Sequence, residues 1–366
     1  MTHSLTVFSA PGRYVQGPDA TRHLAGELKY LGFSGPVLIA ASSSARKSLS
    51  DTWHETFLKA GIKYSVHIFG GECTAEEIVA IEDAAKAESA DCVIGCGGGK
   101  VLDAARAAAA TLNIGFCSAP TLASTDAPCS ALSVVYHKNG EVSEYRILRR
   151  NPDLVLVDSS VVAKAPSRLL VAGMGDALAT WFEARTCAAN KVKNMRGGAS
   201  TISALALAEL CYKTLLSEGA QAIDAVKSQS TNPSLEKIIE ANTLLSGLGF
   251  ESSGLAAAHA VHNGLTAHPA THDFYHGEKV AFGVLTQLVL EGAPRHEIDE
   301  VLTFARQVGL PTCLRQIGII EPSRQDLLKI GERTCRPGET IHNEPFRVDP
   351  KMVADAISEA DMIGRS

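Results

Sequence analysis

Five of the 12 histidines in this chain of 366 residues lie in one short stretch of its C-terminal half. They are His259, His262, His268, His272 and His276. Imidazole is the commonest metal ligand in proteins, so this crowding indicates a metal centre. His259 and His262 are spaced i, i+3 and would share one face of a helix, so either could be the ligand while the other supports it. Taken singly, such a histidine is usually a hydrogen-bonded core residue.

A carboxylate far upstream is a candidate for a further ligand. Asp176 lies in the apolar segment 172–179, where an ionised carboxylate is costly unless it is paired or bound to a metal. Catalytic zinc sites typically combine three protein ligands, from His and Asp or Glu, with a position open to water or substrate. The alternative interpretation of Asp176 is a helix N-cap that follows Gly175.

A glycine-rich loop in the N-terminal half indicates a nucleotide site. An apolar strand expected at 91–95 leads into this loop, which contains Gly97, Gly98, Gly99 and Lys100. Such a junction directs backbone N–H groups at an anion from the positive end of a helix dipole, and Lys100 could add a charged contact. The run is not the Gly-x-Gly-x-x-Gly fingerprint, and a tight strand-to-helix turn is the alternative. Together, a nucleotide site and a metal site indicate redox chemistry on a small alcohol.

Length and composition exclude several classes of protein. Single cores stop growing at roughly 250–300 residues, so two domains are expected. The net charge of -6 provides no basic face for nucleic acid, and no apolar run reaches the roughly 18–20 residues of a membrane span. No signal peptide is visible, and the nine cysteines include no Cys-x-x-Cys pair. We therefore expect reduced thiols in a cytoplasmic protein.

Strand and helix patterns alternate between residues 36 and 160, which implies parallel β-α-β units. We predict strands at 36–41, 64–69, 91–95 and 154–157, helices at 46–60, 75–89 and 100–112, and a hairpin of 131–136 and 142–148 around Asn139-Gly140. Only helical periodicity follows, at 167–188, 194–217, 233–248, 254–268, 277–292, 296–308, 323–333 and 350–363. This order predicts an α/β, Rossmann-like dinucleotide-binding domain at 1–163 and an all-helical metal and substrate domain at 164–366.

Motifs in order along nearly the whole chain resemble those of one family. They are Pro11–Gly17 (PGRYVQG), Gly97–Asp103 (GGGKVLD), Pro120–Ser130 (PTLASTDAPCS), Gly175-Asp176-Ala177, Ala258–Gly264 (AHAVHNG), His276–Lys279 (HGEK) and Ile341–Phe346 (IHNEPF). On these residues the chain resembles the iron-containing (group III) alcohol dehydrogenase superfamily, whose architecture is similar to that of dehydroquinate synthase. The long motif at 120–130 resembles the glycerol-oxidising branch.

The resemblance implies a set of metal ligands, which are Asp176, His259 and His276. Iron-dependent relatives carry a further histidine four residues after the aspartate, where this chain has Thr180. This departure favours Zn2+ over Fe2+.

The resemblance also implies contacts with cofactor and substrate. Pyrophosphate contacts fall on Gly98, Gly99 and Lys100. Further dinucleotide contacts fall on Thr121, Ser124, Ser130, Leu132, Val134 and Tyr136. The residue that binds the substrate polyol falls on Asp126.

The function implied by the resemblance is metal-dependent oxidation of glycerol, or of a similar vicinal diol, with hydride transfer to a nicotinamide cofactor. Asp126 would accept a hydrogen bond from the neighbouring hydroxyl and so help to select diols. His262 is a candidate for relaying the proton outwards, and packing beside a ligand is its alternative role. Family members form oligomers, octamers among them, so we expect a homo-oligomer.

The choice of cofactor departs from the family pattern. Relatives that use NAD carry an acidic residue at the end of the second strand to hold the ribose 2′-OH, whereas this chain has Ala40-Ala41-Ser42-Ser43. The absence of the acid removes a barrier to a 2′-phosphate, which Arg46 or Lys47 could approach. The usual cofactor of the family is NAD, which we expect here, with NADP as the alternative.

Three alternatives are less consistent with the sequence. A dehydroquinate-synthase-like lyase and a glycerol-1-phosphate dehydrogenase each need a cluster of Lys and Arg, and none accompanies the stretch 259–276. A dinucleotide-binding regulator with a structural metal would have a closed site of four ligands. The three candidate ligands favour an open, catalytic site instead.

Overall fold

The computed structural model describes residues 5–138 and 142–366. Within these residues the chain forms two compact units. An α/β unit contains residues 9–166 and 225–243, and a helical unit contains residues 5–8, 167–224 and 244–366. None of the described helices combines the length and the apolar character needed to cross a bilayer.

The α/β unit is built on a six-stranded parallel sheet in the order β1-β8-β5-β4-β2-β3. Its strands are β1 (Tyr14–Gly17), β2 (Val37–Ala41), β3 (Tyr64–Ile68), β4 (Cys92–Gly97), β5 (Gly115–Pro120) and β8 (Leu154–Asp158). Every residue of β2, β4, β5 and β8 is buried, as expected for a parallel sheet with both faces covered. The predicted α/β class is confirmed.

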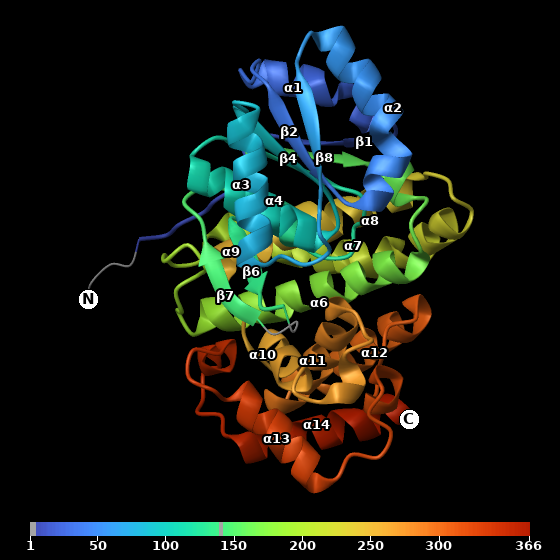
Figure 1. Ribbon diagram of the computed structural model, residues 1–366. Helices are drawn as coiled ribbons and strands as arrows, with labels where there is room; N and C mark the ends of the chain where they lie inside the picture. The colour runs from blue at the N-terminus through green and yellow to red at the C-terminus, as the bar shows by residue number, and fades with distance from the viewer. Residues whose placement is uncertain (1–4, 139–141) are drawn as a thin grey trace. The chain divides into compact units, whose positions relative to one another are not determined.

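Helices cover both faces of this sheet (Figure 1). They are α1 (Leu24–Tyr30) and α2 (Ser43–Ala60) on one face, and α3 (Ala75–Ala87) and α4 (Gly99–Leu112) on the other. Successive residues of a strand point to opposite faces. Ile39 of β2 accordingly joins the core with Trp53 of α2, whereas its neighbour Leu38 joins the core with Ile81 of α3.

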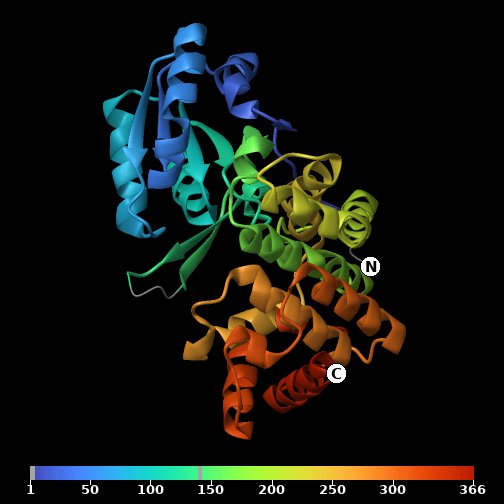
Figure 2. The same cartoon turned by 90° about the vertical axis from the view of Figure 1, so that its right-hand side faces the viewer.

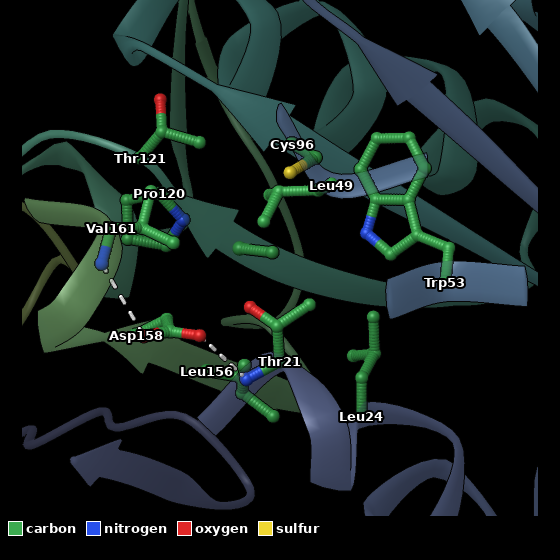
Figure 3. Close-up of a pocket in the computed structure, with 11 residues that line it drawn as sticks. Thr21, Leu24, Leu49, Trp53, Cys96, Pro120, Thr121, Leu156, Asp158 and Val161 are labelled. Atoms are coloured by element: carbon green, nitrogen blue, oxygen red, sulfur yellow. Dashed lines mark hydrogen bonds between the residues drawn. The ribbon is translucent and has the colours of Figure 1, made fainter. Parts of the chain in front are cut away.

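A small cavity lies near the carboxyl ends of β4, β5 and β8 (Figure 3). It is lined by Thr21, Leu24, Leu49, Trp53, Cys96, Ala119, Pro120, Thr121, Leu156, Asp158 and Val161. Its volume is about 10 Å³, which is room for about one water molecule. The cavity is therefore too small for a dinucleotide or a polyol.

A separate two-stranded hairpin extends from the α/β unit (Figure 2). It pairs β6 (Leu132–Tyr136) with β7 (Val142–Ile147) in antiparallel register, as predicted, and the turn predicted at Asn139-Gly140 lies outside the described residues. Helix α4 anchors this hairpin, because Asp103 Oδ2 accepts the Val134 N–H at 3.2 Å and Arg106 donates to the Leu132 carbonyl.

The helical unit contains most of the helices of the C-terminal half. They are α6 (Ser167–Ala189), α7 (Ile202–Lys227, which runs three residues into the α/β unit), α9 (Ser246–Ser253), α10 (Ala257–Leu265), α11 (His276–Leu290), α12 (Arg295–Val308), α13 (Arg324–Thr334) and α14 (Pro350–Arg365). Short helices α5 (Ser159–Val162) and α8 (Pro233–Glu240) belong to the α/β unit. Residues 167–366, all of them described, contain no strand, as predicted.

The compact units differ from the predicted division at residue 163: their main boundary follows residue 166, and two short segments belong to the other unit. Residues 5–8 belong to the helical unit, because the Val7 N–H binds the Ala199 carbonyl and Asn194 binds the Val7 carbonyl at 2.7 Å. Residues 225–243 belong to the α/β unit, because α8 packs on β1 and Gln16 of β1 donates to Glu236 of α8 at 2.7 Å. Neither attachment has a local sequence signal.

We predict that Arg106→Met destabilises the protein by about 3–5 kcal/mol, because it leaves the buried Asp103 carboxylate without its partner. Arg106 is 2% exposed and donates to Asp103 at 2.7 Å and to the Ala127 carbonyl at 2.7 Å. Urea unfolding measures the loss. Arg146→Met, which breaks a half-exposed pair with Glu144, is the control and should cost less than about 1 kcal/mol. Equal losses in the two variants would contradict this account.

Candidate functional site

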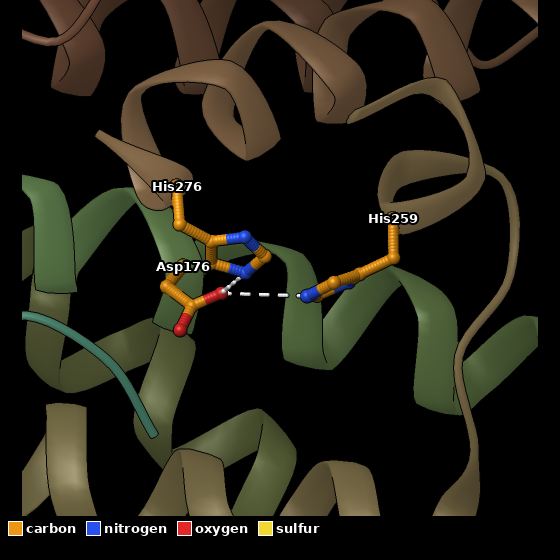
Figure 4. Close-up of side chains that lie close together, drawn as sticks. All are labelled: Asp176, His259 and His276. Carbon is orange, nitrogen blue, oxygen red and sulfur yellow. Dashed lines mark ion pairs between the residues drawn. The ribbon is translucent and has the colours of Figure 1, made fainter. Parts of the chain in front are cut away.

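Three side chains from three helices converge in the helical unit (Figure 4). Asp176 lies within α6, His259 lies on α10, and His276 is the first residue of α11. The Nε2 atoms of His259 and His276 lie 3.3 and 3.0 Å from Asp176 Oδ1. One ligand atom from each residue lies within 4.8 Å of the others, so the group could hold a single metal ion. These are the three residues that the family resemblance implies as metal ligands.

Two glycines allow α6 and α11 to approach closely enough for these ligands to meet. A Cβ atom at Gly277 would lie 1.7 Å from the Ala172 carbonyl oxygen, and one at Gly175 would lie 2.3 Å from the Gly277 carbonyl oxygen. Each glycine is the chain neighbour of a candidate ligand, Asp176 or His276. The backbone contact of the two helices therefore brings the carboxylate and the imidazole together.

The charges at the site compensate one another. Burial raises the pKa of Asp176, but His276 and His259 together hold that pKa well below its usual value. For His259, burial lowers the pKa, yet Glu183 and Asp176 raise it well above the value of free imidazole. Asp176 is therefore ionised although it is only 1% exposed, and a bound cation would take over the compensation that the imidazoles provide. The alternative of Asp176 as a helix N-cap is wrong, because Asp176 lies well inside α6.

His262 lies beside the group and contacts one of its members. Its Nε2 is 3.0 Å from Nδ1 of His276, and its Nδ1 is 3.1 Å from Oδ1 of Asn263. Burial, followed by His276 and Lys279, lowers the pKa of His262 well below its usual value. If His262 is neutral and its Nδ1–H donates to Asn263, its Nε2 accepts a hydrogen bond from Nδ1–H of His276. The Nε2 atom of His276 is then free to bind a metal. This contact is compatible both with a proton relay and with orientation of His276.

The position four residues after Asp176 provides no further ligand. Thr180 is buried, and its Oγ1 is hydrogen-bonded to Oγ of Ser246 at 2.7 Å. The described residues therefore offer three ligands at this centre, a number that leaves a position for water or substrate on a catalytic metal. The side chain of His276 is 37% exposed whereas that of His259 is 13% exposed, so the group is most open on the side of His276.

Glu183 is a residue of the site that sequence reasoning missed. It is fully buried on α6, and its Oε2 lies 2.6 Å from Nδ1 of His259. A buried carboxylate behind a metal-binding histidine is a common arrangement, because it orients the ring. The available signal was its position seven residues after Asp176, which puts both carboxylates on the same face of an amphipathic helix.

In the α/β unit, the glycine-rich loop lies between β4 and the N-terminus of α4. A Cβ atom at Gly97 would lie 2.8 Å from Cγ2 of Val101, so packing alone requires that glycine. Cβ atoms at Gly98 and Gly99 would meet their nearest neighbours only at 3.4 and 3.8 Å. Packing does not require these two glycines, and their bare backbone at a helix N-terminus suits a phosphate group. The pyrophosphate of a dinucleotide therefore fits this loop.

Lys100 has partners of its own. Its Nζ lies 2.5 Å from Oε2 of Glu72 and 5.3 Å from the ring centre of Tyr136. Lys100 must therefore leave Glu72, or share it, to contact a pyrophosphate.

The structure gathers most of the other expected cofactor residues near this loop. The Thr121 N–H donates to the Gly97 carbonyl at 3.0 Å. Three expected residues lie on the half-buried face of β6, whose other face is buried; they are Leu132, Val134 and Tyr136. Ser130 is buried, with Oγ 3.2 Å from the Ala127 carbonyl, and Ser124 lies in the loop that follows β5. Asp126 is also buried, at the N-terminal end of the short 3-10 helix Ala127–Cys129.

Comparisons with known proteins agree with this arrangement. Residues 11–159 match the family model described as "Iron-containing alcohol dehydrogenase". The chain is 52% identical to glycerol dehydrogenase of Thermotoga maritima, over 98% of this chain and 97% of that protein. It is 47% identical to glycolaldehyde reductase of Halobacterium salinarum, over 98% of each chain.

A solved structure extends the comparison to three dimensions. The crystal structure of glycerol dehydrogenase from Schizosaccharomyces pombe superposes with a TM-score of 0.95 at 34% identity, covering 99% of this chain and 92% of that one. This chain belongs to the iron-containing alcohol dehydrogenase family. It is accordingly an oxidoreductase that uses a nicotinamide cofactor and a metal.

We predict that Gly277→Ala weakens both the fold and the metal centre. The added methyl group overlaps the Ala172 carbonyl and must push α11 away from α6, at a cost of about 1–3 kcal/mol. Urea unfolding of the metal-free protein and zinc titration measure the two effects. Gly26→Ala, at a helical position with open space around the new methyl group, is the control. Unchanged stability and zinc affinity in Gly277→Ala would contradict the role of this contact.

Proposed function

We propose that this chain oxidises glycerol, or a similar small vicinal diol, to the hydroxyketone with transfer of hydride to NAD. With glycerol the product is dihydroxyacetone. The observation that carries the proposal is the Asp176, His259 and His276 group, found in a chain 52% identical to a glycerol dehydrogenase. The oxidoreductase names of the relatives favour this function over a lyase or a binding protein with a structural metal.

Each group of residues has a part in this reaction. A divalent cation, when bound, supplies Lewis acidity that lowers the pKa of a coordinated hydroxyl. Asp176, His259 and His276 would hold it. Gly98 and Gly99 would bind the pyrophosphate with their N–H groups, with Lys100 adding a charge. Asp126 would accept a hydrogen bond from the neighbouring hydroxyl and favour diols over simple alcohols.

Zinc is the proposed metal. Three ligands of mixed carboxylate and imidazole type are usual for catalytic zinc. Thr180 replaces the additional histidine of iron-dependent relatives, and its hydroxyl is already bonded to Ser246.

NAD is the proposed cofactor because it is usual in the family, although no acidic residue stands at the end of β2. Ser42 follows β2 and caps α2, because its Oγ accepts the Ala45 N–H at 3.1 Å. A small neutral residue there does not repel a 2′-phosphate, so NADP belongs in the test.

We further propose a cytoplasmic homo-oligomer. All nine cysteines are free, eight of them buried, in keeping with a reducing compartment. Size-exclusion chromatography with light scattering measures the oligomeric state.

A related activity is the second candidate. A glycolaldehyde reductase is 47% identical to this chain, which supports reduction of a small hydroxyaldehyde as the principal reaction. This reaction uses the same metal and cofactor sites in the opposite direction.

An initial-rate panel decides between these activities. We expect NAD to be reduced with glycerol, 1,2-propanediol or 2,3-butanediol, with higher kcat/KM than for ethanol or for NADP. Dialysis against a chelator should abolish the rate, and Zn2+ should restore it better than Fe2+. Preferred oxidation of NADH by glycolaldehyde would favour the second candidate, whereas full activity in metal-free protein would exclude the metal mechanism.

Asp126→Ala tests the proposed substrate contact. The KM for glycerol should rise at least about tenfold, because the loss of a hydrogen bond to a charged group costs about 1.5–3 kcal/mol, while the KM for NAD should change little. Ser124→Ala, in the same loop, is the matched variant and should affect the KM for NAD instead. Equal changes in both KM values for Asp126→Ala would contradict the assigned role.

A further inference from the structure

The N-terminus of α10 is satisfied by buried side chains from other parts of the helical unit. Oε1 of Glu183 accepts the N–H groups of Ala256 and His259 at 2.8 and 2.9 Å. Oε1 of Glu344 accepts the Ala257 N–H at 3.1 Å, and Oε1 of Gln287 accepts the Ala258 N–H at 2.9 Å. The first N–H groups of a helix lack partners inside it, and here three side chains supply them.

Glu183 differs from the other two because its second oxygen contacts a candidate metal ligand. Oε2 of Glu183 lies 2.6 Å from Nδ1 of His259, on the opposite side of the ring from Asp176. One carboxylate therefore binds both the backbone N–H and the imidazole of the same histidine. This double contact fixes the ring relative to its own helix.

The contact also determines which ring nitrogen carries a proton. An ionised carboxylate is an acceptor only, so Nδ1 of His259 must be the donor in this short contact. In a neutral ring the lone pair is then on Nε2, the atom that faces Asp176. The carboxylate thus selects the tautomer that a metal at the Asp176, His259 and His276 group requires.

The carboxylate of Glu183 is fully buried, and three N–H groups surround it. Two backbone N–H groups at the positive end of α10 and the imidazole N–H all point at it. A helix N-terminus favours a carboxylate, and hydrogen bonds to the charged form stabilise it further. The contacts between Glu183 and the start of α10 therefore also hold its carboxylate in place as an acceptor for His259.

We infer that Glu183 is the positioning residue of the metal centre, which orients His259 and fixes its tautomer for metal binding. This inference rests on the proposed metal centre. It assigns a role in metal affinity to a side chain that does not contact the metal.

Glu183→Gln tests the inference with almost no change of shape. The amide oxygen can still accept the two N–H groups of α10, but the amide nitrogen would present a donor to Nδ1 and favour the opposite tautomer. We expect the zinc affinity of the metal-free full-length protein to fall by about 10–100-fold, the range for loss of such a partner. Competition with a chromophoric zinc chelator measures it without any turnover.

Glu344→Gln is the matched control. Glu344 is also buried and also accepts an N–H at the start of α10, and burial together with Glu291 raises the pKa of its carboxyl group to about 8. The neutral amide should keep this cap, so zinc affinity should stay within about twofold, since the contact does not include a ligand ring. An equal loss in both variants would mean that Glu183 acts only as a helix cap and would overturn the inference.

Two further variants separate the possible failures. His259→Ala should lose zinc binding; if it keeps the affinity of the unaltered protein, the proposed metal centre itself is wrong. If His259→Ala loses zinc but Glu183→Gln does not, only the role of Glu183 fails. Should Glu183→Gln not fold, Glu183→Asp replaces it, because the shorter carboxylate keeps the charge but cannot span both contacts. Unchanged zinc affinity in Glu183→Asp then overturns the inference.

Discussion

The direct backbone contact between α6 and α11 is the constraint on which the metal centre depends. Helices that carry side chains at their crossing point usually lie 8–10 Å apart, whereas Gly175 and Gly277 allow carbonyl and Cα atoms to touch. A short Asp side chain can then reach the imidazole at the start of the facing helix. The ligands are consequently fixed by rigid elements rather than by a flexible loop, which is the arrangement that holds a site most accurately.

Charge compensation is the second condition for this centre. Helix α6 carries Asp176 and Glu183 two turns apart on a buried face, with Thr180 between them. The ring of His259 lies between the two carboxylates, with one nitrogen directed at each. Buried carboxylates are tolerated only when their hydrogen bonds are satisfied, and here the start of α10 supplies the N–H groups that Glu183 needs. The helix end and the imidazole together stabilise negative charge that the apolar surroundings would otherwise exclude.

The sequence predicted the elements better than it predicted their partners. Apolar runs located β2, β3, β4 and β8, and most helices from α6 onwards were recognised from their periodicity. However, α7 begins at Ile202 rather than at 194, and the predicted helix 233–248 covers α8 and only the start of α9. Strands β1 and β5 and helix α1 were missed. The sequence of β5, GFCSAP, contains residues that are rare in strands. It is extended because β4 and β8 pair with it on either side, which is information from elsewhere in the chain.

The same distinction applies to the site. The crowding of histidines indicated a metal centre, but the residues alone left His259 and His262 equivalent, and only the family resemblance separated them. The structure places His262 against His276, outside the Asp176 contact. For Glu183 the only local signal was its position seven residues after Asp176, because its partners are two N–H groups and a ring more than 70 residues away.

The attachment of residues 5–8 and 225–243 has a consequence for how this chain can be divided. The polypeptide passes between the two compact units at four places, after residues 8, 166, 224 and 243. A gene fragment that begins at residue 167 would encode α8 without β1, and the apolar side chains of Leu235, Ile238 and Ile239 would lose their cover. Neither compact unit can therefore be cut out as one continuous segment. A fusion or a chimera with a relative has to keep all four connections between the units.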